Sequence, residues 1–477
     1  MLFNSLDFAI FLPIVFILYW FVVNKNLKFQ NALLLLASYV FYGWWDWRFL
    51  SLLMFSTIVD YTIGLQMEKS TNLKYRKFLL FLSLGVNLGL LGFFKYYNFF
   101  IDNFTTAFTF FGGTIQPNTL SIILPVGISF YTFQTLSYTI DIYRRKIGPT
   151  KDFLSFAAFV SFFPQLVAGP IERASNLLPQ FHKEREFDKA EAVIGVKQII
   201  WGLFKKIVIA DNCAQFANEI FANHANFSSA TLIIGVIYFS FQIYCDFSGY
   251  SDIAIGTARL FNFKLMVNFR YPYFSRDIAE FWRRWHISLT TWFRDYVYIP
   301  LGGSRVSRNK QIRNVFIVFI VSGFWHGANW TFIVWGAINA LFFIPLLLSR
   351  KNRTNTDTVA FNKVLPSLRE IVSLLITYCI ALFGWIFFRA VSVKDAVDYI
   401  KGILKFDFNI EMLNIERYSF EIIPLIVILL GIEWYSRNIE FPLYSARPTY
   451  LKVSLIIAMI LIFGSFSIAQ DFIYFQF

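Results

Sequence analysis

Long apolar runs, separated by short clusters of basic residues, dominate the pattern along the chain. These runs are roughly 15–25 residues long, which is the length of a membrane-spanning helix. Lipid offers no hydrogen-bond partner to a backbone N–H or C=O group, so we expect the runs to be helices. The pattern therefore predicts an all-α polytopic membrane protein.

Each apolar run predicts one membrane span. The predicted spans are 6–23, 31–43, 49–66, 78–96, 121–140, 153–170, 192–210, 231–250, 312–325, 330–348, 370–389, 420–436 and 450–469. The aromatic segment 99–112 is short enough to be re-entrant, and 390–418 has room for an amphipathic segment. The stretch 211–230 is nearly free of Lys and Arg, so we expect a loop on the side away from the cytoplasm.

Composition and charge support this class. The chain is 57% hydrophobic and 15% charged, whereas soluble domains are about one quarter charged. The net charge of +13 indicates basic cytoplasmic loops rather than nucleic-acid binding. Three scattered cysteines form neither a disulfide framework nor a metal pattern. The first apolar run lacks a basic leader and a cleavage site, so we expect a retained helix.

Basic residues concentrate in 256–313, which holds eleven Lys or Arg and three acidic residues. We therefore place the segment 251–311 on the cytoplasmic side. At helical spacing, residues 281–296 form an amphipathic helix with Trp282 and His286 on its aromatic face and Arg283 and Arg284 on the other. A hydrogen-bonded buried histidine is the simpler interpretation of His286.

The stretch Ser322 to Trp330 places His326 between two glycines and several aromatic residues. Its apolar flanks, 312–325 and 330–348, both lead to basic residues, so we predict a hairpin over 312–348. The 14 residues of the first arm rise about 21 Å, less than the roughly 30 Å hydrocarbon core. His326 is therefore expected inside the membrane, where a titratable group marks a functional site.

Two further polar groups lie at the expected membrane depth. Ser, Thr and Gln side chains occur within 124–134, where they either join helices or line a cavity. The segment 242–252 contains Asp246, Ser248, Ser251 and Asp252. These four side chains either cap a helix or bind a ligand.

Seven motifs resemble the bacterial membrane-bound O-acyltransferases that acetylate alginate and related cell-surface polysaccharides. In chain order they are FYGWWDWRFL (41–50), LPVGISFYTFQTLSYTIDIYRR (124–145), SFFPQLVAGPIERA (161–174), FQIYCDFSGYSDIAIG (241–256), FWRRWHISLTTWFRDYVYIPLGGSR (281–305), SGFWHGANWTFIVWG (322–336) and FIYFQF (472–477). The teichoic acid D-alanyltransferases resemble the chain around the same histidines. The alginate branch fits better at 41–50 and at the C-terminus.

The resemblance implies one membrane domain over 1–477, a ring of about 11 transmembrane helices around a thin core with short, re-entrant and interfacial helices. It implies that His326 is the catalytic histidine and His286 a second functional histidine. It implies a bacterial inner-membrane enzyme that binds no cofactor or metal. The acyl donor would be acetyl-CoA or an acyl-carrier protein in the cytoplasm. On the outer side, the acyl group would pass to a polysaccharide, directly or through an extracytoplasmic acetyltransferase.

The chemistry assigns roles within this expectation. Imidazole has an unperturbed pKa near neutrality, so His326 is suited to act as general base on a hydroxyl, and the sequence has no GxSxG motif for a serine nucleophile. His286 would orient the thioester, and Asn329 would polarise its carbonyl. The expected substrate-binding residues are Asn329, Trp325, Trp285, Arg283, Arg284, Asp246 and Ser248. A transporter or flippase is the rival class, although the sequence shows no inverted repeat.

Overall fold

Helices built from the apolar runs make up the regular structure of this chain. The computed structural model describes residues 1–110, 119–167, 169–409, 422–445, 447, 449–466 and 472–473, and these contain no strand. Five helical stretches are long and apolar enough to cross a membrane: Leu27–Lys69, Leu73–Phe110, Ser229–Leu260, Trp330–Leu348 and Leu368–Arg389. Shorter apolar helices accompany them. The predicted all-α polytopic membrane protein is confirmed.

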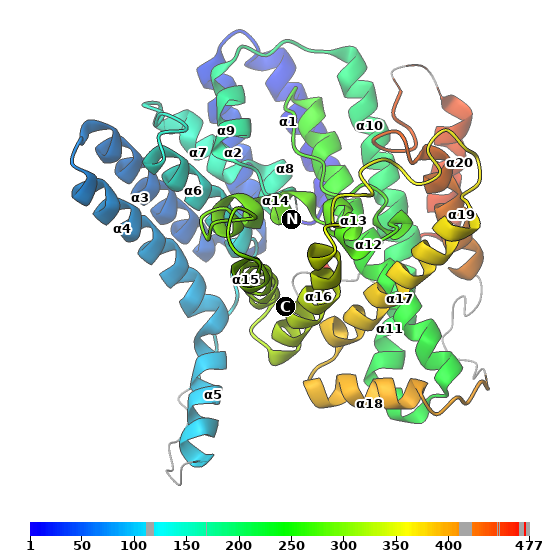
Figure 1. Cartoon of the computed structure of the whole chain (residues 1–477). Coiled ribbons are helices and arrows are strands. Elements are labelled where there is room, and N and C mark those ends of the chain that lie inside the picture. Colours follow the sequence, from blue (N-terminus) through cyan, green and yellow to red (C-terminus); the bar gives the residue numbers. More distant parts are fainter. Residues whose placement is uncertain are drawn as a thin grey trace. The chain divides into compact units, whose positions relative to one another are not determined.

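The chain divides into two compact units, whose helices are labelled in Figure 1. The first unit comprises Met1–Gly195 and Ala254–Met266. Its helices are α1 (Leu6–Ile17), α2 (Leu27–Asp46), α3 (Leu50–Lys69), α4 (Leu73–Leu91), α5 (Tyr97–Phe110), α6 (Ile128–Tyr143), α7 (Phe153–Ser161), α8 (Phe163–Leu166) and α9 (Ala174–Leu177).

The second unit comprises Val196–Ile253 and Val267–Phe477. Its helices are α11 (Asp211–Ala222), α13 (Ile278–Arg284), α14 (Ile287–Phe293), α15 (Arg308–His326), α16 (Trp330–Leu348), α17 (Leu368–Arg389), α18 (Val393–Ile403), α19 (Ile422–Ser436) and α20 (Tyr450–Phe463). Helices α10 (Lys189–Leu203) and α12 (Ser229–Leu260) contribute residues to both units.

Two local expectations were wrong. The aromatic segment 99–112 is not re-entrant up to Phe110, because α5 continues α4 through one π-helical turn, Gly92–Tyr96. The expected loop 211–230 contains α11 and the start of α12. A scarcity of Lys and Arg indicates the side of the membrane but not the backbone conformation. In α11, apolar residues such as Phe216 and Ile220 recur at helical spacing and are buried.

The polar side chains of the predicted span 121–140 join helices within the first unit. Asp60 of α3 accepts hydrogen bonds from Ser83 (2.6 Å) and Asn87 (2.9 Å) of α4. Thr135 of α6 donates to the same Asn87 at 3.2 Å, and Gln134 donates to the backbone carbonyl of Phe159. Of the two alternatives left open by the sequence, these contacts support the one in which polar groups connect the helices.

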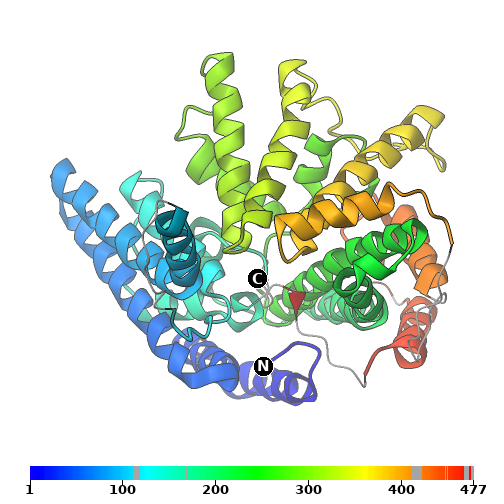
Figure 2. The ribbon, with the colours of Figure 1, turned by 90° about the horizontal axis from the view of Figure 1, so that it is seen from below.

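Helices α15 and α16 cover the range of the expected hairpin 312–348, and they lie antiparallel and side by side (Figure 2). Glycines bring the two backbones into contact. A Cβ atom on Gly323 would lie 2.2 Å from the carbonyl oxygen of Phe332, and one on Gly336 would lie 2.3 Å from that of Phe319. No side chain fits at either position, so these glycines set the separation of the two helices.

A buried ionic network joins the π-helical turn Phe204–Ala210, which follows α10, to α11 and α12. Lys206 is fully buried, and its Nζ lies 2.8 Å from Asp211 Oδ1 and 2.9 Å from Asp246 Oδ1. Lys205 pairs with Asp252 at 2.6 Å and donates to Ser248 at 2.9 Å. Charges in this environment are tolerated because each has a close partner.

We predict that Gly336→Val separates α15 from α16, because the new side chain would collide with the backbone of Phe319. The expected loss of stability is about 3 kcal/mol, the upper end of the usual range for overpacking. Gly431→Val is the matched control, since a Cβ atom at Gly431 meets nothing within 4 Å. Thermal denaturation of the detergent-purified variants measures both effects. Equal melting temperatures for the two would contradict the close-contact interpretation.

We predict that Lys206→Met is strongly destabilising, because it leaves the carboxylates of Asp211 and Asp246 buried without their common cation. Breaking such a pair costs roughly 3–5 kcal/mol. Lys401→Met is the control, since Lys401 pairs with Asp398 on the surface, where a pair contributes about 1 kcal/mol or less. The two melting temperatures are compared under identical conditions, and a larger shift for Lys401→Met would refute the prediction.

Candidate active site

His286 lies at a break between two short helices, α13 and α14. Its backbone is left-handed, with φ 42° and ψ 55°, a conformation that residues other than glycine rarely adopt. The single amphipathic helix predicted over 281–296 is therefore wrong. Asn268 stabilises the break, because its backbone carbonyl accepts from the N–H of Ile287 (2.9 Å) and its side-chain oxygen contacts both His286 and Ser288.

His326 is the last residue of α15, and three aromatic rings surround its imidazole. The ring centroids of Trp325, Trp335 and Phe388 lie 5.0, 5.3 and 5.2 Å from that of His326. All three rings meet the imidazole at steep angles, between 73° and 87°. These contacts, which come from α15, α16 and α17, fix the orientation of a histidine that is 4% exposed.

The two histidines line one small cavity, of about 60 Å³. The ring of Trp325 lies close to both, 6.1 Å from His286 and 5.0 Å from His326. Trp285 also lines the cavity. The structure thus brings together four of the sequence-predicted site residues in the second unit. The remaining lining residues are Trp282, Leu289, Thr290, Phe293, Val318, Phe319 and Ser322.

Four residues with polar side-chain groups at this site were not among the site residues named from the sequence. Trp282, Thr290 and Ser322 line the cavity, and Asn268 contacts His286. The indole Nε1 of Trp282 is buried, with no hydrogen-bond acceptor among the described residues. Helical periodicity already placed Trp282 on the face of His286, but gave its N–H no role. Asn268 carried no sequence signal, because the contact depends on a turn between distant segments.

Burial controls the protonation of His286, which lies in the turn between α13 and α14. Loss of hydration disfavours the imidazolium form and lowers the pKa of His286 to about 3. The side chain is therefore neutral at physiological pH. A neutral imidazole has one N–H donor and one nitrogen that accepts a hydrogen bond.

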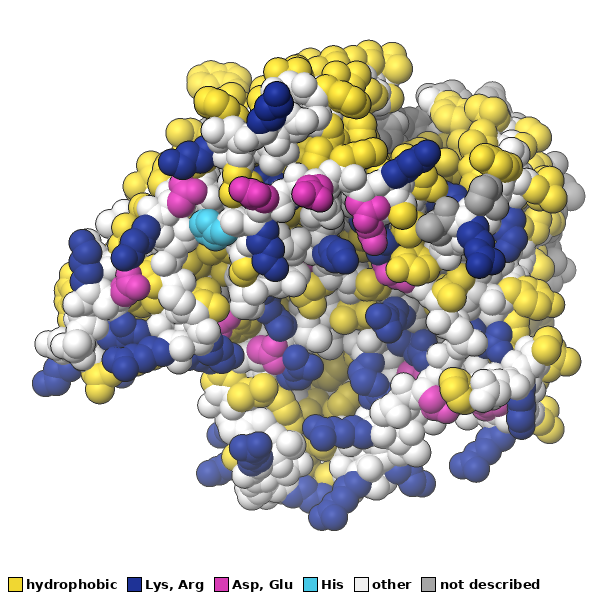
Figure 3. All heavy atoms as spheres, turned by 90° about the horizontal axis from the view of Figure 1, so that it is seen from above, with side chains coloured by type: hydrophobic (Ala, Val, Ile, Leu, Met, Phe, Trp, Pro, Cys, Tyr) yellow, Lys and Arg dark blue, Asp and Glu magenta, His cyan; other side chains and the backbone are white. Residues whose placement is uncertain are grey.

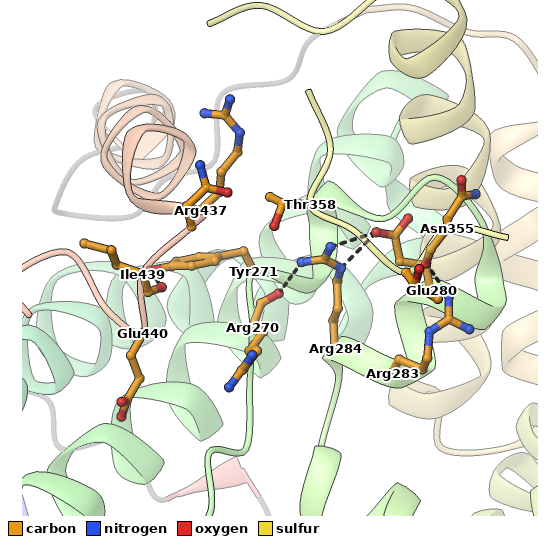
Figure 4. Close-up of a pocket in the computed structure, with 12 residues that line it drawn as sticks. Arg270, Tyr271, Glu280, Arg283, Arg284, Asn355, Thr358, Arg437, Ile439 and Glu440 are labelled. Atoms are coloured by element: carbon orange, nitrogen blue, oxygen red, sulfur yellow. Dashed lines mark hydrogen bonds and ion pairs between the residues drawn. The ribbon is translucent and has the colours of Figure 1, made fainter. Parts of the chain in front are cut away.

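A second, larger cavity of about 360 Å³ lies beside α13 (Figure 4). Arg283 and Arg284 line it, as do Arg270 and Arg437 from two other segments. The remaining lining residues are Tyr271, Glu280, Asn355, Thr356, Thr358, Asn438, Ile439 and Glu440. Lys and Arg side chains are widespread on the face shown in Figure 3. This cavity and the histidine cavity both have α13 in their walls.

The arginines of the larger cavity differ in how their charge is compensated. Arg284 pairs with Glu280 at 2.8 Å. Arg283 instead donates to the carbonyl oxygens of Asn352 and Asn355, and Arg437 donates to those of Val359 and neighbouring residues. A carbonyl oxygen satisfies a guanidinium N–H but carries no net charge. The cavity wall therefore keeps a positive charge that suits an anionic ligand.

The remaining predicted residues lie outside both cavities. Asn329 is the N-cap of α16, where its side-chain oxygen accepts from Thr331 N–H and its amide donates to the carbonyl of Val391. Asp246 and Ser248 belong to the buried ionic network, and Asp246 Oδ2 also accepts from the backbone N–H of Ile473 at 2.8 Å. Their predicted substrate contacts stay predictions.

Two further features of the sequence concern metal ligands and the terminal motif. Within the described parts of the chain, no three His, Cys, Asp or Glu side chains gather where they could hold a metal ion. Of the motif FIYFQF, the structure describes Phe472 and Ile473, while 474–477 lie outside the described residues. Phe472 packs against Phe247 and Tyr250 of α12.

Comparison with known proteins gives consistent results. The family model for the membrane-bound O-acyltransferase family (MBOAT) matches residues 144–388, a range that includes both histidines. The probable alginate O-acetylase AlgI of Pseudomonas putida is 38% identical over 455 residues, which cover 94% of this chain and 90% of the relative. The probable AlgI of Pseudomonas aeruginosa is 42% identical over 401 residues, covering 83% of this chain and 73% of the relative.

A third relative has a different acceptor in its name. The peptidoglycan O-acetyltransferase of Helicobacter pylori is 37% identical over 433 residues, covering 85% of this chain and 80% of the relative. The family match, the extent of these similarities and the multi-pass helical architecture agree with one another. The chain belongs to the membrane-bound O-acyltransferase family and is an O-acyltransferase.

Proposed function

We propose that this protein moves an acetyl group from a cytoplasmic thioester across the bacterial inner membrane to hydroxyls of a cell-surface polysaccharide similar to alginate. The observation that carries the proposal is that His286 and His326, distant in sequence, line one cavity of about 60 Å³. A cavity of this size suits a small acyl group. The names of the relatives, alginate O-acetylase and peptidoglycan O-acetyltransferase, support acetyl as that group.

His326 acts as the general base in this proposal. The hydroxyl oxygen of the acceptor bonds to the thioester carbonyl carbon, and its proton passes to the imidazole. The C–S bond then breaks, and the imidazolium returns the proton to the departing thiolate. The overall reaction consumes no proton and needs no bound cofactor. A positioned base typically contributes 10²–10⁴-fold to such a rate.

Two other groups support this step. The carbonyl oxygen gains negative charge as the hydroxyl attacks, and a hydrogen-bond donor aimed at it stabilises the transition state. The indole N–H of Trp282 suits that role, because it is buried and has no other acceptor among the described residues. The amide of Asn329, which the sequence suggested for it, caps α16 and binds Val391. Neutral His286 is suited to orienting the donor.

The arginine-lined cavity suits the anionic part of the donor, whether coenzyme A or the acidic surface of an acyl-carrier protein. Arg283 and Arg284 point to one side of α13, and Trp282 and Trp285 line the histidine cavity. A donor bound on both sides would have its charged part on the arginines and its acyl group beside the histidines. The positive-inside rule places this basic segment on the cytoplasmic side.

Two routes of transfer to the acceptor are compatible with this proposal. Alginate or a related polysaccharide receives the acyl group directly, or an extracytoplasmic acetyltransferase collects it first. Two alternative reactions lie within the same family: transfer of an acyl group to peptidoglycan, and transfer of D-alanine to teichoic acid. Transport of a whole glycan is the alternative from another class. It shares the membrane architecture but gives no role to a buried pair of histidines.

We predict that His326→Ala abolishes acetylation, with a loss of at least about 100-fold, because the general base is removed. The measurement is mass analysis of acetyl groups on the surface polysaccharide, at equal amounts of folded membrane protein. His182→Ala is the matched control, since His182 is exposed in the first unit. Normal acetylation in the His326 variant refutes the proposed mechanism. Loss of polysaccharide export together with acetylation supports the transporter instead.

We predict that Arg270→Glu raises KM for the acyl donor about tenfold and leaves kcat nearly unchanged. Arg270 is exposed at the cavity, and its guanidinium makes no ion pair or hydrogen bond among the described residues. Tenfold corresponds to about 1.4 kcal/mol, as expected for one exposed charge contact. Arg305→Glu, an exposed charge reversal outside the cavity, is the control. An equal rise in KM for both variants would assign the effect to net charge.

A further inference from the structure

Asn268 contacts His286 without lining the cavity that His286 shares with His326. Its Oδ1 lies 3.0 Å from His286 Nδ1, and both residues are 1% exposed. The contact matters because the hydrogen bond made by one ring nitrogen of a neutral imidazole determines whether the other nitrogen is a donor or an acceptor.

Neighbouring contacts identify the amide oxygen of Asn268. The atom facing His286 also receives the backbone N–H of Ser288 (3.4 Å) and the hydroxyl of Ser288 (2.9 Å). The amide nitrogen faces the hydroxyl oxygen of Ser251 at 3.1 Å. A backbone N–H can only donate, so the atom that it faces must be the oxygen. His286 Nδ1 must then carry the hydrogen of the Nδ1···Oδ1 contact.

This assignment determines the other ring nitrogen. A neutral imidazole carries a single N–H, and with Nδ1 protonated, Nε2 has a lone pair. The pKa of about 3 that burial gives His286 keeps the ring in this neutral form. His286 then cannot protonate a departing thiolate. It can accept a hydrogen bond, and its ring lines the cavity that it shares with His326.

We propose that Asn268 is a positioning residue: it holds His286 as the Nδ1–H tautomer, so that Nε2 accepts a hydrogen bond from an N–H or O–H group of a substrate. The inference rests on the proposed acyl transfer. It assigns the two histidines different work, with His286 as a fixed acceptor and His326 as the group that exchanges a proton. Asn268 acts only through His286 and does not contact the reacting atoms.

The backbone at the break supports this role. The left-handed conformation of His286 is unfavourable for a residue with a side chain and persists only where its surroundings enforce it. Asn268 supplies three of those contacts, to the N–H of Ile287, to Ser288 and to the imidazole. One residue therefore sets both the backbone angle and the tautomer. A continuous helix through 281–296 would offer no such acceptor to Nδ1.

The first test needs no change at Asn268. The chain contains four histidines, so ¹⁵N-histidine labelling gives a simple spectrum, and His286→Gln identifies the signals of His286. The expected result at neutral pH is a protonated Nδ1 and an unprotonated Nε2. The reverse tautomer, or a doubly protonated ring, would overturn the proposal. Because this measurement uses the wild-type protein, it decides the tautomer even if variants at Asn268 fail to fold.

The second test asks whether the tautomer matters for transfer. Asn268→Asp keeps an acceptor for Nδ1–H and for Ser288, and the hydroxyl of Ser251 can turn to donate to it. The added negative charge favours imidazolium and raises the pKa of His286. We expect nearly normal activity at high pH and a new loss of activity as pH falls. Asn268→Leu removes the acceptor and should lower kcat at least about 10-fold at every pH.

Asn314→Leu is the matched control, because Asn314 is a fully buried asparagine in the same unit that donates to the backbone carbonyl of Leu301. It should lower stability without changing the pH profile of the folded protein. A wild-type pH profile for Asn268→Asp, or full activity for Asn268→Leu, would reduce Asn268 to a structural role. His326→Ala distinguishes a failure of the proposed function from a failure of the role proposed for Asn268. If that variant still transfers acetyl groups, the proposed function fails, whatever Asn268 does.

Discussion

The contact of the α15 and α16 backbones is the constraint on which the rest of the site depends. Gly323 and Gly336 let the carbonyl oxygens of the facing helix approach to a distance that excludes any side chain. The chain reverses between His326 and Trp330. The last residue of α15 therefore lies beside the first two turns of α16. The ring of Trp335 can therefore lie 5.3 Å from the imidazole of His326 and orient it.

Both histidines of the small cavity lie where regular helix stops. His326 ends α15, and His286 occupies a left-handed position between α13 and α14. Irregular backbone inside a membrane protein is tolerated only where protein or water satisfies its polar groups. Asn268 does this at His286, and the cap formed by Asn329 does it at the start of α16. The histidines thus occupy the points where the structure supplies extra hydrogen-bond partners.

Sequence patterns predicted the features that depend on local spacing. The α15–α16 hairpin, the basic segment around α13 and the grouping of Trp282 with His286 follow from flank charges and helical periodicity. Features that depend on contacts between distant segments were not predictable. The turn at His286 is held by contacts with Asn268, eighteen residues earlier. The acidic residues of 242–252 looked like caps or ligands because their partners, Lys205 and Lys206, lie on another helix.

In the proposed reaction, the short helix α13 would let one substrate be both charged and buried. Its seven residues rise only about 10 Å, so it forms a partition and does not span a membrane. Arg283 and Arg284 line the polar cavity, and Trp282 and Trp285 line the histidine cavity. Moving a charged group into the second cavity would carry the cost of desolvation without compensation by a partner. In the proposed reaction a thioester would avoid this cost, because its charged part would stay at the arginines while only the neutral acyl end would reach the histidines. The arrangement favours substrates whose charge lies some distance from the reactive carbonyl, and it disfavours free carboxylates.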